Sequence, residues 1–227
     1  MGARLRLVVE AGSRWSAPRS ILWKLWKPED GATPHSGKIT LNVCFLNGSN
    51  ADHDTVRKLA PQWTQGRLGN RVVFRFDAPA RSSQIRIRFR GRGASVTSLG
   101  REALKKTKHE ETMHLSVVDQ RDILHEFGHA LGLSHEHQHP ESGIRWNKRV
   151  VIGDLKREAG WTAEMCEKQI FEHLSKNCTC IGDPKPDPLS IMLYPIRKSW
   201  TLDHKGTRHN TTISERDHQC LEREYRA

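Results

Sequence analysis

Hydrophobic and polar residues alternate in four short stretches of the first half of the chain. These stretches are 39–45, 72–76, 85–89 and 113–117. Side chains two residues apart point to the same face of a strand, so each stretch predicts a half-buried β-strand. We expect Thr112 to Val117 to form the edge of the sheet, where an extended peptide could pair with it.

The 85–89 stretch and its C-terminal neighbour carry arginines at alternate positions, Arg86, Arg88 and Arg90. Such a row could bind nucleic acid, but it has no interleaved aromatic residues on the same face. We therefore interpret the row as a solvated face of the sheet.

A period near 3.6 residues predicts four helices. The first is capped by Asp54, carries Trp63 on its apolar face and is kinked at Pro61. The others are Arg121 to Leu131, capped by Asp119 or Asp122, a helix capped by Thr162, and a terminal helix in the stretch Ile213 to Tyr225, capped by Ser214. The stretch 146–155 reads as irregular. Strands alternate with helices, which indicates an α/β protein with a mixed sheet.

The composition limits the class of protein without identifying it. The chain has 227 residues, enough for one domain with an extension, and a formal net charge of +11. The charge favours polyanions and acidic substrates but names no partner. No stretch is apolar over the roughly 18 to 20 residues that a membrane span needs, and no export signal is readable.

The helix predicted at 121–131 carries the motif H-E-x-x-H-x-x-G-x-x-H, made by His125, Glu126, His129, Gly132 and His135. Histidines four residues apart share one face of a helix, so both imidazoles can bind one metal ion. Gly132 can adopt the left-handed conformation that ends the helix and brings His135 back as a third ligand.

Three imidazoles without cysteine indicate a catalytic zinc site, with one zinc ion per chain and a position left for water. Glu126 follows the first ligand and is suited to act as general base and acid for a zinc-bound water. His137 and His139 come shortly after the ligands. We interpret them as surface residues or as neighbours of the ligands, because three ligands are already present.

These residues resemble the metzincin metallopeptidases, and Glu136 directly after the third histidine resembles the astacin family among them. The stretch Ser190 to Pro195 is similar to the methionine turn that metzincins carry beneath the metal. The resemblance implies that Met192 lies under the metal. It also implies that Tyr194 is a displaceable further ligand that stabilises the oxyanion.

The resemblance implies a metzincin fold: a twisted mixed sheet with an antiparallel edge strand, two main helices and a smaller C-terminal part with a terminal helix. We expect a basic extension at 1–21 and a catalytic domain at 22–227, divided into an upper part at about 22–132 and a lower part at about 133–227. Secretion is expected by resemblance, and a cytoplasmic location otherwise.

We therefore expect a zinc-dependent endopeptidase that hydrolyses peptide bonds in proteins. Its partners are protein or peptide substrates, with no specific nucleic acid and no membrane, and the chain is a monomer. Arg197 and Lys198 lie where such enzymes build the pocket after the scissile bond, which predicts a preference for acidic or small residues there. The alternative is a basic, zinc-stabilised protein that binds anionic polymers without proteolytic activity.

The five cysteines, Cys44, Cys166, Cys178, Cys180 and Cys220, form no zinc-ribbon spacing. A bridge between Cys44 and Cys220 would join the first strand to the last helix. Free buried thiols are the other interpretation.

Overall fold

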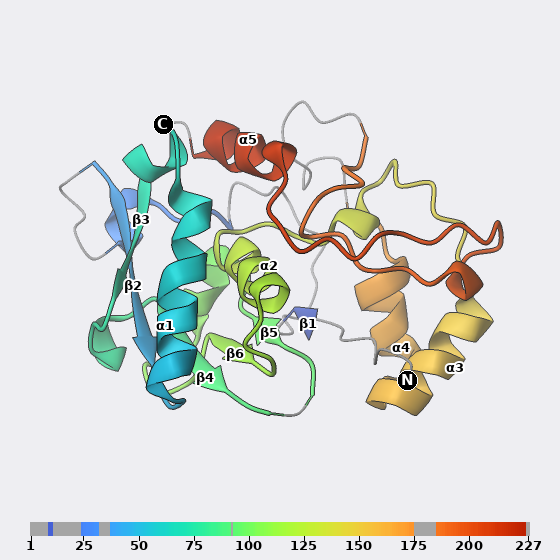
Figure 1. Ribbon diagram of the computed structural model, residues 1–227, viewed down its shortest axis with the longest axis horizontal. Helices are drawn as coiled ribbons and strands as arrows, with labels where there is room; N and C mark the ends of the chain where they lie inside the picture. The colour runs from blue at the N-terminus through green and yellow to red at the C-terminus, as the bar shows by residue number, and fades with distance from the viewer. Residues whose placement is uncertain (1–8, 11–23, 32–36, 92, 175–184, 226–227) are drawn as a thin grey trace.

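The computed structural model describes residues 9–10, 24–31, 37–91, 93–174 and 185–225 (Figure 1). Its sheet has the strand order β1-β5-β6-β4-β2-β3. The strands are β1 (Val9–Glu10), β2 (Ile39–Phe45), β3 (Val72–Phe76), β4 (Ile85–Phe89), β5 (Val96–Thr97) and β6 (Met113–Leu115). Neighbouring strands are parallel except β5 and β6, which pair antiparallel. The predicted α/β class with a mixed sheet is confirmed.

Two predictions about the strands are wrong. β6 lies between β4 and β5, so the antiparallel strand near the edge is β5 and not Thr112 to Val117. Val9 and Glu10 pair with the outer side of β5. The second prediction concerns β2, which was expected to be half-buried. It is buried along almost its whole length, because it is flanked by β3 and β4 and packed on both faces.

The α-helices are α1 (Asn50–Leu59), α2 (Gln120–Ala130), α3 (Lys148–Ala159), α4 (Ala163–Cys166) and α5 (Glu215–Glu224). Shorter 3₁₀ segments are Pro28–Asp30, Ala60–Thr64, Leu68–Asn70, Ala80–Ser82, Gly100–Lys105, Glu136–Gln138 and Lys198–Trp200, and Glu167–Phe171 forms a π-helical turn. In Figure 1, α1 and α2 lie on the same side of the sheet, whereas α3 and α4 lie away from it.

The helix ends show how the sequence sets these elements. Ser49 caps α1 by accepting a hydrogen bond from the Asp52 N–H, so the predicted cap at Asp54 is wrong. The chain changes to a 3₁₀ turn at Ala60, next to Pro61, which cannot donate a helical hydrogen bond. Asp119 caps α2 and Ser214 caps α5, as predicted.

The stretch 146–155, expected to be irregular, contains most of α3. Its apolar run Val150, Val151 and Ile152 has no helical spacing, and Gly153 interrupts it. Only Val151 and Leu155 of this helix are buried. The helix is therefore stabilised by tertiary packing of this narrow face, and the spacing of its hydrophobic residues does not predict it.

Arg86 also departs from the expectation of a solvated arginine row. Its side chain is buried and donates hydrogen bonds to the carbonyls of Glu110, Ser83 and Thr107. Arg88 and Arg90 both pair with Glu111. Arg86 thus ties the long connection before β6 to the sheet.

Cys44 and Cys166 are buried free thiols, so no bridge joins Cys44 to Cys220. Cys220 is disulfide-bonded to a different residue. Cys178 and Cys180 lie outside the described residues.

Two hydrophobic clusters divide the interior. The larger one contains the sheet, α1, α2, Met192 and the end of α5. The smaller one contains α3, α4 and Phe171, together with Tyr194, Ile196 and Trp200. The methionine turn therefore contributes to both clusters, with Met192 in one and Tyr194 in the other. Among the described residues, no helix is long and apolar enough to cross a membrane.

Candidate metal centre

α2 is held in place by aromatic side chains that bind its carbonyl groups. The Trp63 indole N–H donates to the Leu124 carbonyl (2.8 Å), and the Trp26 indole N–H donates to the Ala130 carbonyl (2.7 Å). The Tyr225 hydroxyl donates to the Leu131 carbonyl (2.9 Å). The last carbonyls of a helix have no intrahelical partner, so the contacts at Ala130 and Leu131 fix the C-terminal end of α2, whereas the Trp63 contact holds its middle.

The structure brings His125, His129 and His135 together. One ring nitrogen from each lies within 4.8 Å of the others, and all three side chains are buried. After α2, Gly132 has φ of +102°, a conformation that favours glycine. This turn returns the chain so that His135 faces the two histidines of the helix. The predicted geometry of the motif is therefore present.

Backbone carbonyls orient two of these rings. His125 donates its Nδ1–H to the Ile191 carbonyl (2.8 Å), and His129 donates its Nδ1–H to the Leu133 carbonyl (2.7 Å). Because the proton is on Nδ1, each Nε2 presents a lone pair. Nε2 of His129 lies 3.1 Å from Nε2 of His135. Within the described part of the chain, Nε2 of His125 is buried without a hydrogen-bond partner.

Burial also keeps these imidazoles neutral. Desolvation lowers the pKa of His125 and His135 well below the usual histidine value, and it lowers the pKa of His129 to about 4. Neutral imidazole is the form that binds metal. Three converging nitrogen donors, with no cysteine or carboxylate among them, fit a zinc ion that keeps an open position.

Tyr194 lies beside the histidines, and Glu126 lies on the helix that carries two of them. Glu126 is fully buried on α2, between the two helical histidines. The Tyr194 ring centroid lies 4.3 Å from that of His135 and 6.2 Å from that of His125. The Thr207 hydroxyl donates to the Tyr194 carbonyl (2.6 Å), which fixes the backbone that carries this tyrosine.

Met192 packs directly beneath α2. A Cβ atom on Gly128 would lie 2.5 Å from the Met192 sulfur, so only glycine allows this approach. The turn is held by Asp217 of α5, which accepts hydrogen bonds from the Ser190 hydroxyl and the Ile191 N–H. Sequence reasoning missed Asp217. Its only signal was the Ser214-x-x-Asp217 spacing, which is also that of an ordinary helix cap.

Glu136 lies beside the third histidine and joins it to the methionine turn. Its N–H donates to the Met192 carbonyl (3.1 Å), and its carboxylate accepts from the Asp187 N–H (2.6 Å). Burial, with Asp217 and Asp187 close by, raises the pKa of Glu136 to about 7. Glu136 and Asp187 also line a cavity of about 460 Å³.

His137 and His139 are both buried, so the expectation of surface positions is wrong. The His137 ring stacks near His135 and Tyr194, with centroid distances of 5.2 Å and 4.4 Å. Neither residue belongs to the group of three converging nitrogens, which agrees with the interpretation that they are not ligands.

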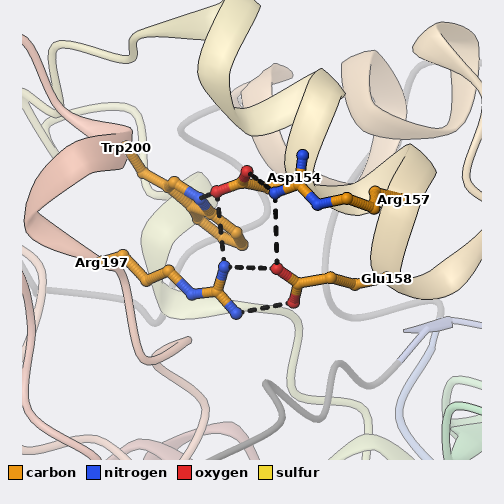
Figure 2. Close-up of polar contacts among 5 residues, drawn as sticks. All are labelled: Asp154, Arg157, Glu158, Arg197 and Trp200. Carbon is orange, nitrogen blue, oxygen red and sulfur yellow. Dashed lines mark hydrogen bonds and ion pairs between the residues drawn. The ribbon is translucent and has the colours of Figure 1, made fainter. Parts of the chain in front are cut away.

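The Arg197 guanidinium pairs with acidic side chains of α3. Figure 2 shows its guanidinium facing α3, where it donates to both carboxylate oxygens of Glu158 (2.7 and 2.6 Å) and reaches Asp154 (3.4 Å). It also lies over the Trp200 ring. Its charge is balanced by two carboxylates, which weakens the case for Arg197 as a receptor for acidic substrate residues.

Comparison with known proteins gives matches among solved structures alone. No protein-family model matches the chain, and no curated protein does. Two structures of myroilysin align with it. One has 28% identity over 82% of this chain and 94% of the other, with a TM-score of 0.73; the second has 24% identity over 97% and 91%, with a TM-score of 0.66.

A third match is high choriolytic enzyme 1 from Oryzias latipes (medaka fish), described as a hatching enzyme zinc-protease. It has 16% identity over 95% of this chain and 98% of the other, with a TM-score of 0.58, and shows the fold alone. The fold is therefore shared with a zinc-protease, and the chain carries a histidine triad that could hold a metal ion. The predicted resemblance is confirmed: the chain has the mixed α/β fold of the astacin-like metzincin metalloproteases and carries a histidine triad that could bind their metal.

Proposed function

We propose that this protein is a zinc-dependent endopeptidase with one zinc ion per chain, bound by His125, His129 and His135. The observation that carries the proposal is the convergence of three buried imidazole nitrogens, two of them oriented by backbone carbonyls. Zinc at such a site supplies Lewis acidity, lowering the pKa of water toward about 7 and polarising the substrate carbonyl.

Glu126 moves the proton in this proposal. A carboxylate on the same helix as two ligands is held rigidly, and its burial keeps bulk water away from the reaction. It takes a proton from the attacking water and passes it to the nitrogen of the leaving amine. Glu126 is therefore a catalytic residue and not a ligand.

Tyr194 is the second catalytic residue in the proposal. Its ring lies against His135, and its backbone is fixed by Thr207. From this position its hydroxyl donates a hydrogen bond to the oxyanion as the carbonyl carbon becomes tetrahedral. Gly132 supports the site through its turn, Glu136 through its hydrogen bonds and Met192 through packing against α2, and none of them takes part in the chemistry.

The substrate peptide pairs with β5 in this proposal, because β5 lies nearer the edge of the sheet than β6, runs antiparallel to it and also contacts α2. The Ser95 hydroxyl, next to β5, donates to Asp122 in the first turn of α2, which sets this strand against the metal-binding helix. The outer side of β5 already pairs with Val9 and Glu10. A substrate that uses this side must therefore displace the N-terminal segment.

The direct test of function is Glu126→Gln, with Glu158→Gln on α3 as a matched control remote from the triad. The first variant should retain zinc and lose casein cleavage by at least about a thousandfold. The control should cleave casein like the parent chain. Full cleavage by Glu126→Gln would overturn the proposal.

The alternative, a binding protein for anionic polymers, rests on the net charge of +11. It expects salt-dependent retention on heparin, with no proteolysis in the parent chain and no effect of Glu126→Gln. The same two proteins therefore separate the hypotheses. We also propose that the chain is a monomer. Its catalytic domain extends from residue 22 onward and has an upper and a lower part.

A second test concerns the substrate strand. A chain lacking residues 1–23 keeps the described core from Lys24 onward and frees the outer side of β5. We expect a several-fold higher kcat/KM on an unfolded protein substrate. An unchanged or lower kcat/KM, with zinc content and unfolding midpoint retained, would contradict the placement of substrate on β5.

A further inference from the structure

His137 is an aromatic side chain that the proposed chemistry does not use. It is fully buried, and its ring contacts Trp146, which packs against the smaller hydrophobic cluster. Its centroid is 4.4 Å from that of Tyr194, with an interplanar angle of 31°, and 5.2 Å from that of His135, with an angle of 27°. His137 therefore contacts both a proposed ligand and the proposed oxyanion donor.

The ring of His137 is itself anchored. Its Nε2–H donates to the Gln169 carbonyl in the π-helical turn at 167–171 (3.0 Å). The edge of Trp146 meets the ring at 6.1 Å and 87°, and Trp146 in turn packs on Phe171. His137 is thus fixed by a part of the fold that contributes no residue to the metal centre.

The neighbouring Gln138 binds the same segment. Its side-chain amide donates to the carbonyls of Lys168 (2.9 Å) and Glu172 (3.1 Å). Its own carbonyl accepts from the Leu174 N–H (2.8 Å). These contacts hold the backbone at 137–138, and the hydrogen bond to Gln169 holds Nε2. The His137 ring is therefore fixed at both ends of the side chain.

Tyr194 needs such support on its ring. The Thr207 hydroxyl donates to its carbonyl and so fixes its backbone, at the other end of the residue from the reacting hydroxyl. The nearest rings are those of His135 and His137, at 4.3 and 4.4 Å. An oxyanion donor is effective only within a few tenths of an ångström of its place, and a shift of about 1 Å costs roughly a hundredfold in rate.

We propose that His137 is a positioning residue that holds the Tyr194 ring against the metal centre, with the segment 167–174 as its support. This inference rests on the proposed function, because it assigns His137 a part in the step that Tyr194 serves. It makes His137 neither a ligand nor a proton carrier. His137 acts through Tyr194 alone.

The kinetic test compares His137→Ala and His137→Phe in the zinc-loaded protein. His137→Ala should lower kcat about tenfold with KM changed less than twofold, because the lost contact matters in the transition state. His137→Phe keeps a flat ring against Tyr194 and should recover most of kcat. Loss of zinc from either variant would show that His137 acts on His135 instead, and would overturn the proposal.

A double-mutant cycle with Tyr194→Phe separates a positioning role from general stability. Tyr194→Phe alone should lower kcat about a hundredfold. Once its hydroxyl is gone, His137→Ala should cause no further loss. Additive losses would overturn the proposal for His137 and leave the role of Tyr194 intact. Full kcat in Tyr194→Phe would instead refute the oxyanion role, and with it this inference.

A readout without metal is available because the chain has only two tyrosines, Tyr194 and Tyr225. In the metal-free chain labelled with 3-fluorotyrosine, ¹⁹F NMR should give two resonances, and Tyr194→Phe assigns them. His137→Ala should shift or broaden the Tyr194 resonance. Tyr225, buried and bonded to the Leu131 carbonyl, should stay unchanged as an internal reference.

His53→Ala is the matched control. His53 makes the same two kinds of contact far from the site: its ring stacks on Phe45 at 4.1 Å, and its Nε2 lies 2.8 Å from the Asn47 carbonyl. This variant should leave the Tyr194 resonance and kcat unchanged. An unshifted Tyr194 resonance in His137→Ala would overturn the proposal. If His137→Ala does not fold, His137→Phe and the conservative His137→Gln provide the same comparison.

Discussion

α2 and α3 differ in the burial of their polar side chains. In α2, ten of eleven residues are buried, and they include His125, Glu126 and His129. In α3 only Val151 and Leu155 are buried, and its charged groups are paired near the surface, as Figure 2 shows for Asp154 and Glu158. Buried polar groups are costly, so a helix that concentrates them is maintained for chemistry, whereas α3 has the pattern of a supporting helix.

The largest expected effect concerns the buried histidines of α2. In the metal-free chain, burial lowers the pKa of His129 from 6.5 to about 4. As pH falls through this window the unfolded chain takes up a proton that the folded chain refuses, so the folded state loses stability. We expect a loss of roughly 3 kcal/mol from His129 alone, complete below about pH 4.

Urea unfolding of the metal-free chain at pH 7 and pH 4.5 measures this loss, and His129→Gln should reduce it. The depressed pKa of His129 also places the expected release of zinc toward pH 4, below the ordinary histidine range. Equal stability of the metal-free chain at both pH values would show that burying the histidines of α2 does not cost stability at low pH.

Glu136 should change the stability of the folded chain with pH in the opposite direction to His129. Burial raises its pKa from 4.5 to about 7, so the folded state loses stability as pH rises through this window. Glu136→Gln can still accept from the Asp187 N–H and removes the buried charge. It should stabilise the chain by up to about 3 kcal/mol at pH 8 and by little at pH 4. A stabilisation that does not depend on pH would refute this account of Glu136.

A pair of glycines compares the packing of the two helices. Gly128→Ala on α2 places a methyl group 2.5 Å from the Met192 sulfur and 3.0 Å from the Trp63 ring. Overpacking there should cost about 1 to 3 kcal/mol. Gly153→Ala on α3 has no atom within 4 Å of the new methyl and should stabilise by about 0.5 to 1 kcal/mol.

Thermal unfolding of both glycine variants measures this difference. Similar effects in the two helices would remove the distinction between a tightly packed α2 and an open α3.

The smallest effect belongs to the ion-pair network of α3. Glu158→Gln weakens the bidentate pair with Arg197 at a partly exposed site, and such pairs contribute less than about 1 kcal/mol. Cleavage of a peptide library should show the same preference after the scissile bond in this variant as in the parent chain. A new preference for acidic residues would indicate that Glu158 masks Arg197 as a specificity residue.

The same contrast explains how much could be predicted from sequence. The motif on α2 has fixed spacing, a cap at Asp119 and a glycine at 132, and these local signals predicted the helix, its end and the convergence of three histidines. The Ser190 to Pro195 stretch predicted the methionine turn by resemblance. Each signal lies within a few residues of the feature it predicts.

Features that depend on distant contacts were not predicted. α3 is stabilised by packing on a narrow face, Arg86 is buried against the carbonyls of Thr107 and Glu110 in the connection before β6, and the order of β5 and β6 depends on a chain reversal. Asp217 reaches the methionine turn from the terminal helix. None of these leaves a local pattern, because the partner residues are distant along the chain or the periodic stretch is too short.

The central claim is that His125, His129 and His135 bind one zinc ion through ring nitrogens. Zinc K-edge X-ray absorption on the purified chain, with metal content measured on the same sample, tests it most directly. We expect one zinc per chain, with three imidazole nitrogens at about 2.0 to 2.1 Å and a further light-atom ligand. Sulfur at about 2.3 Å, or no stoichiometric zinc in a chain that retains its fold, would contradict it.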